Sequence, residues 1–161
     1  HSAAATNTSI RVVKGGHVRI RHTYKCNTET CPQIGLVLHY SLNSGAYTAT
    51  PGTFGADNIK FFGITDTSAD IPGQGTATTQ NISSGIFVPA SIVRTSSAIP
   101  TIPAMNAGEV SEIEHIISFD TDATVGAIYD FRLYNQDGAV LNTYTQSGRV
   151  TVLDYTGGAG F

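Results

Sequence analysis

Residues 127–135 read Ala-Ile-Tyr-Asp-Phe-Arg-Leu-Tyr-Asn. The apolar and polar side chains alternate with a period of two, which is typical of a β-strand with one face in a core. Gln-Asp-Gly follows at residues 136–138 and predicts a turn. Residues 139–145 are then expected to pair back as the second strand of a hairpin. This stretch therefore predicts antiparallel β-structure.

The same alternation recurs along the rest of the chain, separated by turns rich in Gly, Pro, Asn and Asp. We expect further strands at residues 9–14, 17–25, 34–42, 46–49, 57–65, 85–93, 110–119 and 149–153. The alternation places nine side chains in the core, namely Leu36, Leu38, Tyr40, Ile113, Ile117, Phe119, Tyr129, Phe131 and Leu133. It places four charged side chains outside, namely Arg19, Arg132, Glu112 and Glu114. About ten mostly antiparallel strands predict an all-β fold, a single β-sandwich that is Ig-like or jelly-roll-like.

The composition supports a β-fold and limits the partners. Charged residues make up 13% of the 161 residues, about half of the usual ~25%. Polarity comes from 21 Thr, 13 Ser and 17 Gly, and 40% hydrophobic residues are enough for a core, so the chain is not expected to be disordered. A net charge of -3 argues against nucleic acid as a partner. No apolar run approaches the ~20 residues of a membrane span.

The chain is expected to form one domain at residues 17–154. An N-terminal strand or arm precedes it at residues 1–16, and a glycine-rich tail follows at residues 155–161. The sequence starts without Met and without a basic and apolar leader, so we interpret it as the mature form of a secreted protein. We expect it outside the cell or on the cell surface.

Cys26 and Cys31 are the two cysteines, and four polar or small residues separate them. A disulfide across this loop is the favoured interpretation, and it predicts an oxidising compartment. The alternative is a metal site, which needs two further ligands, and His22 is the nearest candidate.

Several motifs in a fixed order resemble a known family. They are Arg-Ile-Arg at 19–21, Leu-Val-Leu-His-Tyr-Ser at 36–41, Gly-Ala-Tyr at 45–47, Glu-Ile-Glu at 112–114, and the pattern YxFRLYNxxGxxLxTYT at 129–145, with Val-Thr-Val at 150–152. Over residues 18–152 the chain resembles an Ig-like β-sandwich domain of prokaryotic surface and secreted proteins. The resemblance implies a non-catalytic domain for display, adhesion or assembly. The family's usual first strand, similar to FRWRND, has no counterpart here, so the sandwich is expected to lack one strand of its own.

No catalytic constellation is evident, and we expect neither an enzyme nor a cofactor. There is no Gly-x-Ser-x-Gly nucleophile motif, and Glu112 and Glu114 are interpreted as solvated. His115 lies on an apolar face and is expected to be a hydrogen-bonded core residue. His17 and His39 are expected to face outward on strands that are candidate neighbours, which leaves a metal pair as the alternative to plain surface residues.

His1 raises a separate alternative. A free N-terminal amine and imidazole, joined by a second histidine, is how copper-dependent polysaccharide monooxygenases hold their metal on a β-sandwich. His1 is followed by Ser-Ala-Ala-Ala-Thr, and no motif marks the second histidine. A processed terminus is therefore the favoured interpretation, and the copper enzyme stays a remote alternative.

Calcium and glycans are the remaining ligand candidates. Two pairs of loop aspartates offer oxygen ligands for calcium, although turn-forming aspartates commonly serve their own loop. These pairs are Asp66 with Asp70, and Asp120 with Asp122. Asn7 and Asn81 each begin an N-glycosylation sequon.

Two function classes compete, a structural subunit and a carbohydrate-binding or adhesin module. Sugar binding needs a platform of exposed aromatic rings. There is no Trp, and four tyrosines that we expect on different hairpins are the best candidates, namely Tyr47, Tyr134, Tyr144 and Tyr155. We therefore favour the structural class.

The favoured function is a self-assembling filament or surface-layer subunit that polymerises by strand donation. The missing first strand predicts an open sheet edge, and a segment with strand propensity lies just before a flexible glycine pair. The residues concerned are Ile10, Val12, Val13, Gly15 and Gly16. Head-to-tail addition of such a strand gives a homopolymer, because the contact does not close on itself. Pairing of residues 1–13 within their own sheet is the alternative.

Overall fold

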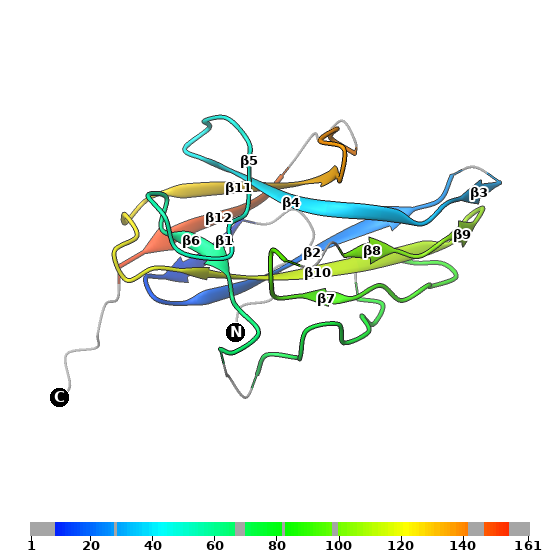
Figure 1. The fold of residues 1–161 in the computed structure, drawn as a ribbon, viewed down its shortest axis with the longest axis horizontal. Coiled ribbons are helices and arrows are strands. Elements are labelled where there is room, and N and C mark those ends of the chain that lie inside the picture. The colour runs from blue at the N-terminus through cyan, green and yellow to red at the C-terminus, as the bar shows by residue number, and fades with distance from the viewer. Residues whose placement is uncertain are drawn as a thin grey trace.

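The computed structural model describes residues 9–27, 29–66, 70–81, 83–97, 100–141 and 147–154. All regular elements in these ranges are β-strands, twelve in number. Two packed sheets form an elongated molecule, and a short two-stranded arm extends from one end (Figure 1). The predicted all-β sandwich is confirmed.

One layer of the sandwich is a six-stranded sheet with the order β1-β12-β11-β4-β5, and β8 also pairs with β4. Its strands are β1 (Ile10–Val13), β4 (Ile34–Leu42), β5 (Thr48–Ala49), β8 (Thr101–Ile102), β11 (Ile128–Asn135) and β12 (Gly148–Leu153). The pairs are antiparallel except for β1 with β12, which is parallel. The first and the last strand of the chain are thus neighbours.

The other layer is a four-stranded sheet with the order β2-β10-β6, and β7 also pairs with β10. Its strands are β2 (His17–Lys25), β6 (Ile59–Phe61), β7 (Ile92–Val93) and β10 (Val110–Phe119). The arm consists of β3 (Thr30–Cys31) and β9 (Met105–Asn106). The Cys26–Cys31 disulfide is present and ties the end of β2 to this arm. The disulfide prediction is therefore confirmed.

Turn chemistry sets the hairpin between β4 and β5. Asn43 and Ser44 both have positive φ, 49° and 66°, and the Gly45 amide donates to the carbonyl of Leu42. Two central residues with positive φ define the type I′ turn, whose twist matches that of paired strands. A turn between the strands expected at 34–42 and 46–49 is therefore confirmed.

The predicted core is confirmed. All nine side chains assigned to it from alternation are buried between the two sheets. Phe131, Leu36 and Ile113 have no exposed surface. Since a register error of one residue moves every side chain to the opposite face, this agreement shows that the strand register was predicted correctly.

Two predicted strands are much shorter than expected, and a third is described only in part. The strand expected at 57–65 is only β6, because the chain turns away at Gly63, where φ is +93°. The strand expected at 85–93 is reduced to β7 and isolated bridges. In the predicted second hairpin strand, Val140 pairs with Tyr134, and residues 142–145 lie outside the described part.

A long irregular segment covers the outer face of the four-stranded sheet. We call residues 70–94, described except for residue 82, the covering segment; it ends in β7, and Figure 1 shows it in green beside β10. Its amides at Thr78 and Ile92 donate to backbone carbonyls within the segment. Because it lies over the sheet, every residue of β10 is buried, on both faces.

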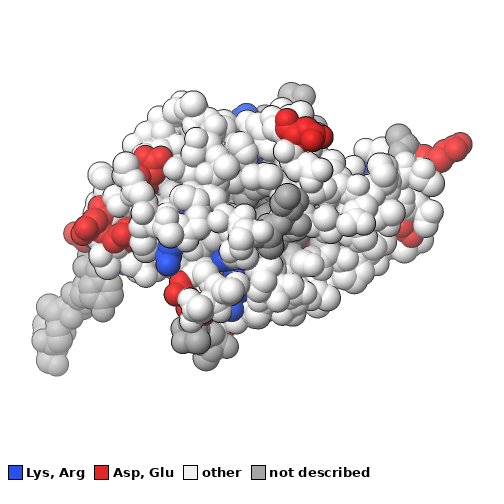
Figure 2. Space-filling model, viewed as in Figure 1, with Lys and Arg blue, Asp and Glu red and all other residues white. Residues whose placement is uncertain are grey.

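The visible surface carries little charge. Figure 2 shows mostly uncharged side chains, with acidic groups in separate places and Lys and Arg in a few small spots. A basic surface for nucleic acid is not evident on this face.

Candidate functional site

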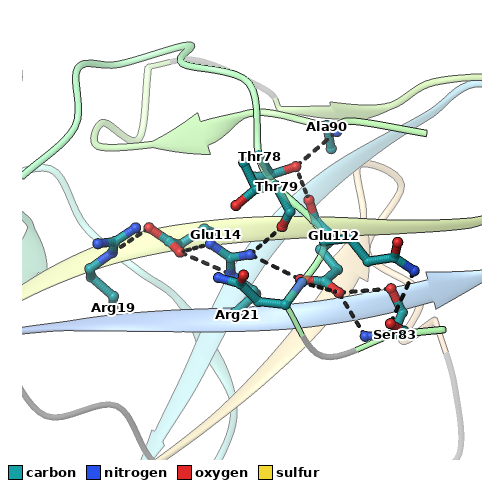
Figure 3. Close-up of polar contacts among 10 residues, drawn as sticks. Arg19, Arg21, Thr78, Thr79, Ser83, Ala90, Glu112 and Glu114 are labelled. Carbon is teal, nitrogen blue, oxygen red and sulfur yellow. Dashed lines mark hydrogen bonds and ion pairs between the residues drawn. The ribbon is translucent and has the colours of Figure 1, made fainter. Parts of the chain in front are cut away.

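The outward faces of β2 and β10 bring four charged residues together. Arg21 lies directly opposite Glu114 in the antiparallel register, and Glu112 lies opposite Thr23, two residues further on. Side chains at directly opposed and diagonal positions of one face lie within reach of each other. Arg19, Arg21, Glu112 and Glu114 therefore form one group, which we call the Arg–Glu cluster (Figure 3).

The ion pairs of the cluster are short and largely shielded from water. Arg19 Nε lies 2.5 Å from Glu114 Oε1, and Arg21 Nη2 lies 2.6 Å from Glu114 Oε2. Arg21 Nη1 lies 2.9 Å from Glu112 Oε2. The side chain of Glu112 is fully buried and that of Arg21 is 11% exposed. Burial alone lowers the pKa of the Arg21 guanidinium, but hydrogen bonds and charges of the two glutamates outweigh this and raise it.

The cluster also holds the covering segment. Glu112 Oε1 accepts hydrogen bonds from the Ser83 amide and hydroxyl, both at 2.7 Å, and Oε2 accepts one from the Asn81 amide at 3.0 Å. Arg21 Nη1 donates to the carbonyl of Thr79. The Thr78 hydroxyl donates to the carbonyl of Glu112 at 2.6 Å and accepts from the Ala90 amide. These contacts, drawn in Figure 3, fix the segment on the sheet.

The prediction that Glu112 and Glu114 are solvated is wrong, and so is the placing of Arg19 outside. Glu112 is 0% and Glu114 is 2% exposed, and the side chain of Arg19 is only 25% exposed. Strand alternation correctly put these residues on the outer face of their sheet. Alternation contains no information on the irregular segment that covers that face. Buried charges need polar partners, and the arginines and the covering segment supply them for the two glutamates.

His22 and His115 lie on the inner face of the same strand pair. Their ring centroids are 6.2 Å apart, and His115 is 0% exposed. Burial lowers the pKa of His22 to about 4, against a hydrogen bond with the Phe131 backbone that raises it. Burial also lowers the pKa of His115 well below its ordinary value, and the nearby His22 adds to this effect. His115 is a core residue as predicted, but the predicted hydrogen bond is absent: neither ring nitrogen has a partner in the described part of the chain.

His17 and His39 are not neighbours, and that prediction is wrong. His17 is on β2 of the four-stranded sheet and contacts the ring edge of Phe62. His39 is on β4 of the six-stranded sheet, where its ring stacks on Tyr134. In the described ranges no three His, Cys, Asp or Glu side chains are arranged to hold a metal ion. His1 lies outside these ranges.

An aromatic group covers part of the outer face of the six-stranded sheet. The rings of His39 and Tyr134 stack with centroids 4.0 Å apart, and Tyr47 lies 6.3 Å from Tyr134. The Arg132 guanidinium lies 4.4 Å from the centre of the Tyr47 ring, and its Nε donates to the Ser147 hydroxyl. We call His39, Tyr47, Arg132 and Tyr134 the aromatic face.

The expectation that the tyrosines lie scattered is wrong for Tyr47 and Tyr134. The register of β4 and β11 places His39 opposite Arg132 and Val37 opposite Tyr134, and the turn after β4 returns Tyr47 to the same place. Arg132 is half-buried and not fully outside as predicted. Tyr144 and Tyr155 lie outside the described residues.

The residues predicted for strand donation lie at one edge of the six-stranded sheet. β1 pairs with β12 of its own chain, with Ile10 opposite Val150 and Val12 opposite Val152. Val12 is 6% exposed and belongs to the core, whereas Val13 is 41% exposed. Gly15, with φ of +75°, and Gly16 form the turn into β2, and a Cβ at Gly16 would lie 2.9 Å from the Val13 carbonyl oxygen.

The calcium and glycosylation candidates have local roles in the structure. Asp120 Oδ1 accepts from the Thr121 hydroxyl and the Asp122 amide, which closes its own turn. Asp66 pairs with Lys60, and Asp70 is exposed. Asn81 is exposed, and its backbone amide donates to the Glu112 carboxylate. Asn7 lies outside the described residues.

No protein-family model, curated protein or solved structure matches this chain. No helix with the length and hydropathy to span a bilayer occurs in the described ranges.

Proposed function

We propose that this protein is a non-catalytic structural subunit of the cell exterior that assembles with copies of itself by exchanging its first strand. The observation that carries the proposal is the position of β1, at the edge of the six-stranded sheet and next to a glycine turn. The Cys26–Cys31 disulfide supports an oxidising compartment outside the cytosol.

Little holds β1 to its own domain. It has four residues, and β12 is its one strand neighbour in the described part of the chain. One of its side chains, Val12, is fully in the core, and Ile10 packs against the core from the edge. Burial of one valine contributes about 1.5–3 kcal/mol. The free-energy cost of a transient release of β1 is therefore small.

An exchanged β1 makes the same contacts in a neighbour as in its own chain. The edge of β12 and the pocket for Val12 are present in every copy, so exchange costs mainly the opening of the turn at Gly15 and Gly16. If each copy gives β1 to the next copy, the contact is head-to-tail and propagates into a filament. Strand addition supplies main-chain hydrogen bonds, and alternate side chains give specificity.

A cysteine pair across β1 and β12 tests this proposal. Arg11 lies opposite Thr151 in the register, so Arg11→Cys with Thr151→Cys places two thiols on adjacent strands. Oxidation of assembled protein is expected to give a ladder of covalent multimers on a non-reducing gel. Ile128→Cys with Thr151→Cys is the matched control, since these residues are partners across β11 and β12, and it is expected to cross-link within one chain.

If the Arg11–Thr151 pair also cross-links only within one chain at high protein concentration, β1 remains paired with β12 of its own chain and the strand-exchange proposal is refuted. Electron microscopy of Val12→Asp gives an independent measurement. A carboxylate in the core pocket is expected to abolish filaments, while Val13→Asp, on the exposed side, is expected to leave them intact.

Carbohydrate binding is the second candidate, and the aromatic face is the observation that favours it. Sugar rings pack on exposed aromatic side chains, and Arg donates to their hydroxyl groups. Glycan-array binding that Tyr134→Ala abolishes, with circular dichroism unchanged, supports this function. Absence of any glycan signal from the intact protein refutes it.

A further inference from the structure

Two buried imidazoles lie between the sheets of this domain, and the proposed assembly does not use them. His22 is opposite Ile113 and His115 is opposite Ile20 in the register of β2 and β10, so the two rings are diagonal neighbours on the inner face. The Phe61 ring from β6 lies 6.2 Å from His115. His22 bonds to the Phe131 backbone of the opposite sheet. The pair thus lies where the two layers meet.

In the described ranges, the hydrogen bond of His22 with the Phe131 backbone favours a positive charge on this pair, and burial outweighs it. Nδ1 and Nε2 of His115 and Nδ1 of His22 have no hydrogen-bond partner in the described ranges. A buried ionised group without a partner is strongly unfavourable. Both rings are therefore neutral in the folded protein.

The charged side chains of the strands packed around the pair lie on the outer faces of their sheets, and the Asp57 carboxylate, which precedes β6, is taken up by the Tyr40 hydroxyl at 2.6 Å. By alternation, the charged side chains of β2, β10, β6 and β11 are on the outer faces of their sheets, and those are Arg19, Arg21, Lys25, Glu112, Glu114, Lys60, Asp130 and Arg132. The titratable groups on the inner faces are phenols, Tyr24 of β2, Tyr40 of β4 and Tyr129 of β11. The phenol hydroxyls of Tyr40 and Tyr129 are bound to Asp57. Phenols are uncharged in acid and do not compensate an imidazolium.

We propose that His22 and His115 form an acid switch, in which proton uptake by the two imidazoles drives the sheets apart and opens the domain. Proton uptake is coupled to opening because the charged rings are tolerated only in water. Above about pH 6.5, the ordinary pKa of histidine, the imidazoles are neutral in both states and the fold keeps its full stability. Below pH 6.5, the two imidazoles bind protons in the opened chain but stay largely unprotonated in the folded chain, so acid favours the opened state.

The size of the effect follows from His22. Its pKa is about 4 in the folded chain, which is about 2.5 units below the ordinary value. Linkage then raises the ratio of opened to folded protein about 120-fold between pH 7 and pH 4 for this residue alone, because half of the folded molecules also carry the proton at pH 4. His115, whose pKa burial also lowers well below its ordinary value, adds to the effect.

Urea unfolding at pH 7, 6, 5 and 4 tests the switch with four substitutions. The wild type is expected to lose stability steeply below pH 6.5, and His22→Leu with His115→Phe is expected to remove most of that loss. His17→Gln and His39→Gln are the matched controls: burial also lowers the pKa of these rings, but they are half-exposed, so they are expected to remove only a small part of the slope. An unchanged slope in the double variant overturns the proposal.

A direct measurement covers the case in which the double variant does not fold. The ¹⁵N shifts of the imidazoles in the wild type are expected to stay at their neutral values down to pH 5 while the amide spectrum remains folded. Titration of His22 and His115 near pH 6.5 within an intact folded spectrum overturns the proposal.

Discussion

Removal of the Glu112 carboxylate is the sharpest perturbation of this structure. Glu112→Ala takes the acceptor from four donors, namely Arg21 Nη1, the amides of Asn81 and Ser83, and the Ser83 hydroxyl. Arg21 keeps Glu114 and the Thr79 carbonyl. The substitution is therefore expected to damage the attachment of the covering segment more than the pairing of the arginines.

The cost is estimated from the burial of the group. Breaking a buried ion pair by removing one partner costs about 3–5 kcal/mol, and each buried donor left unsatisfied costs about 1–3 kcal/mol. Asn81 is exposed, so water replaces part of what its amide loses. We expect a loss of about 3–5 kcal/mol in the free energy of unfolding, which corresponds to a fall in Tm of roughly 10 °C for a chain of this size.

Glu114→Ala and Glu112→Gln are the comparisons that isolate the mechanism. Glu114 pairs with Arg19 and Arg21 but accepts no amide of the covering segment in the described contacts. Urea unfolding measures the stability of all three variants. Amide hydrogen exchange at residues 78–83 is expected to accelerate in Glu112→Ala, to change little in Glu114→Ala, and to lie between in Glu112→Gln, which keeps a neutral acceptor.

A loss below about 1 kcal/mol for Glu112→Ala contradicts the estimate of a buried ion pair. Equal hydrogen exchange at residues 78–83 in the two alanine variants contradicts the role of Glu112 as the anchor of the covering segment. Either result refutes the present reading of the Arg–Glu cluster.

Three further predictions follow from the core. Phe131→Ala, at a site with 0% exposure, is expected to cost about 3–5 kcal/mol in urea unfolding, and a loss below about 1 kcal/mol is incompatible with the assigned register. Cys26→Ser with Cys31→Ser opens a loop with a separation of five residues and is expected to lower the free energy of unfolding by about 2 kcal/mol through loop entropy. Mass spectrometry of the folded wild type without reductant tests the bond itself. Two alkylatable thiols in that experiment contradict the disulfide. Burial, and then the charge of Asp57, raise the pKa of Tyr129 to about 12. The contribution of Tyr129 to stability is therefore complete below about pH 10 and falls as pH rises toward 12. Tyr129→Phe is expected to flatten that fall, and an unchanged alkaline profile contradicts the assignment of the fall to Tyr129.

The local sequence pattern determined the main strands, their inner faces, one turn and the disulfide. Period-two alternation is a property of one segment, so the burial of Phe131, Leu36 and Ile113 was predictable without knowledge of their partners. The turn at Asn43 and Ser44 and the Cys26–Cys31 bond each depend on residues close in sequence. Such features need no tertiary information.

Tertiary structure decided what each outer face meets. Glu112 and Glu114 are buried because an irregular segment without periodicity crosses them, and no local pattern predicts where such a segment lies. Two other expectations about contacts failed for the same reason: His17 and His39 belong to different sheets, and Tyr47 and Tyr134 meet through the pairing of β4 with β11. The pairing of β1 with β12 joins the two ends of the described chain. The order of strands in a sheet is fixed by long-range packing of the whole core. The sequence therefore determined which strand faces are apolar. Only the fold determined which polar groups those strands bring together.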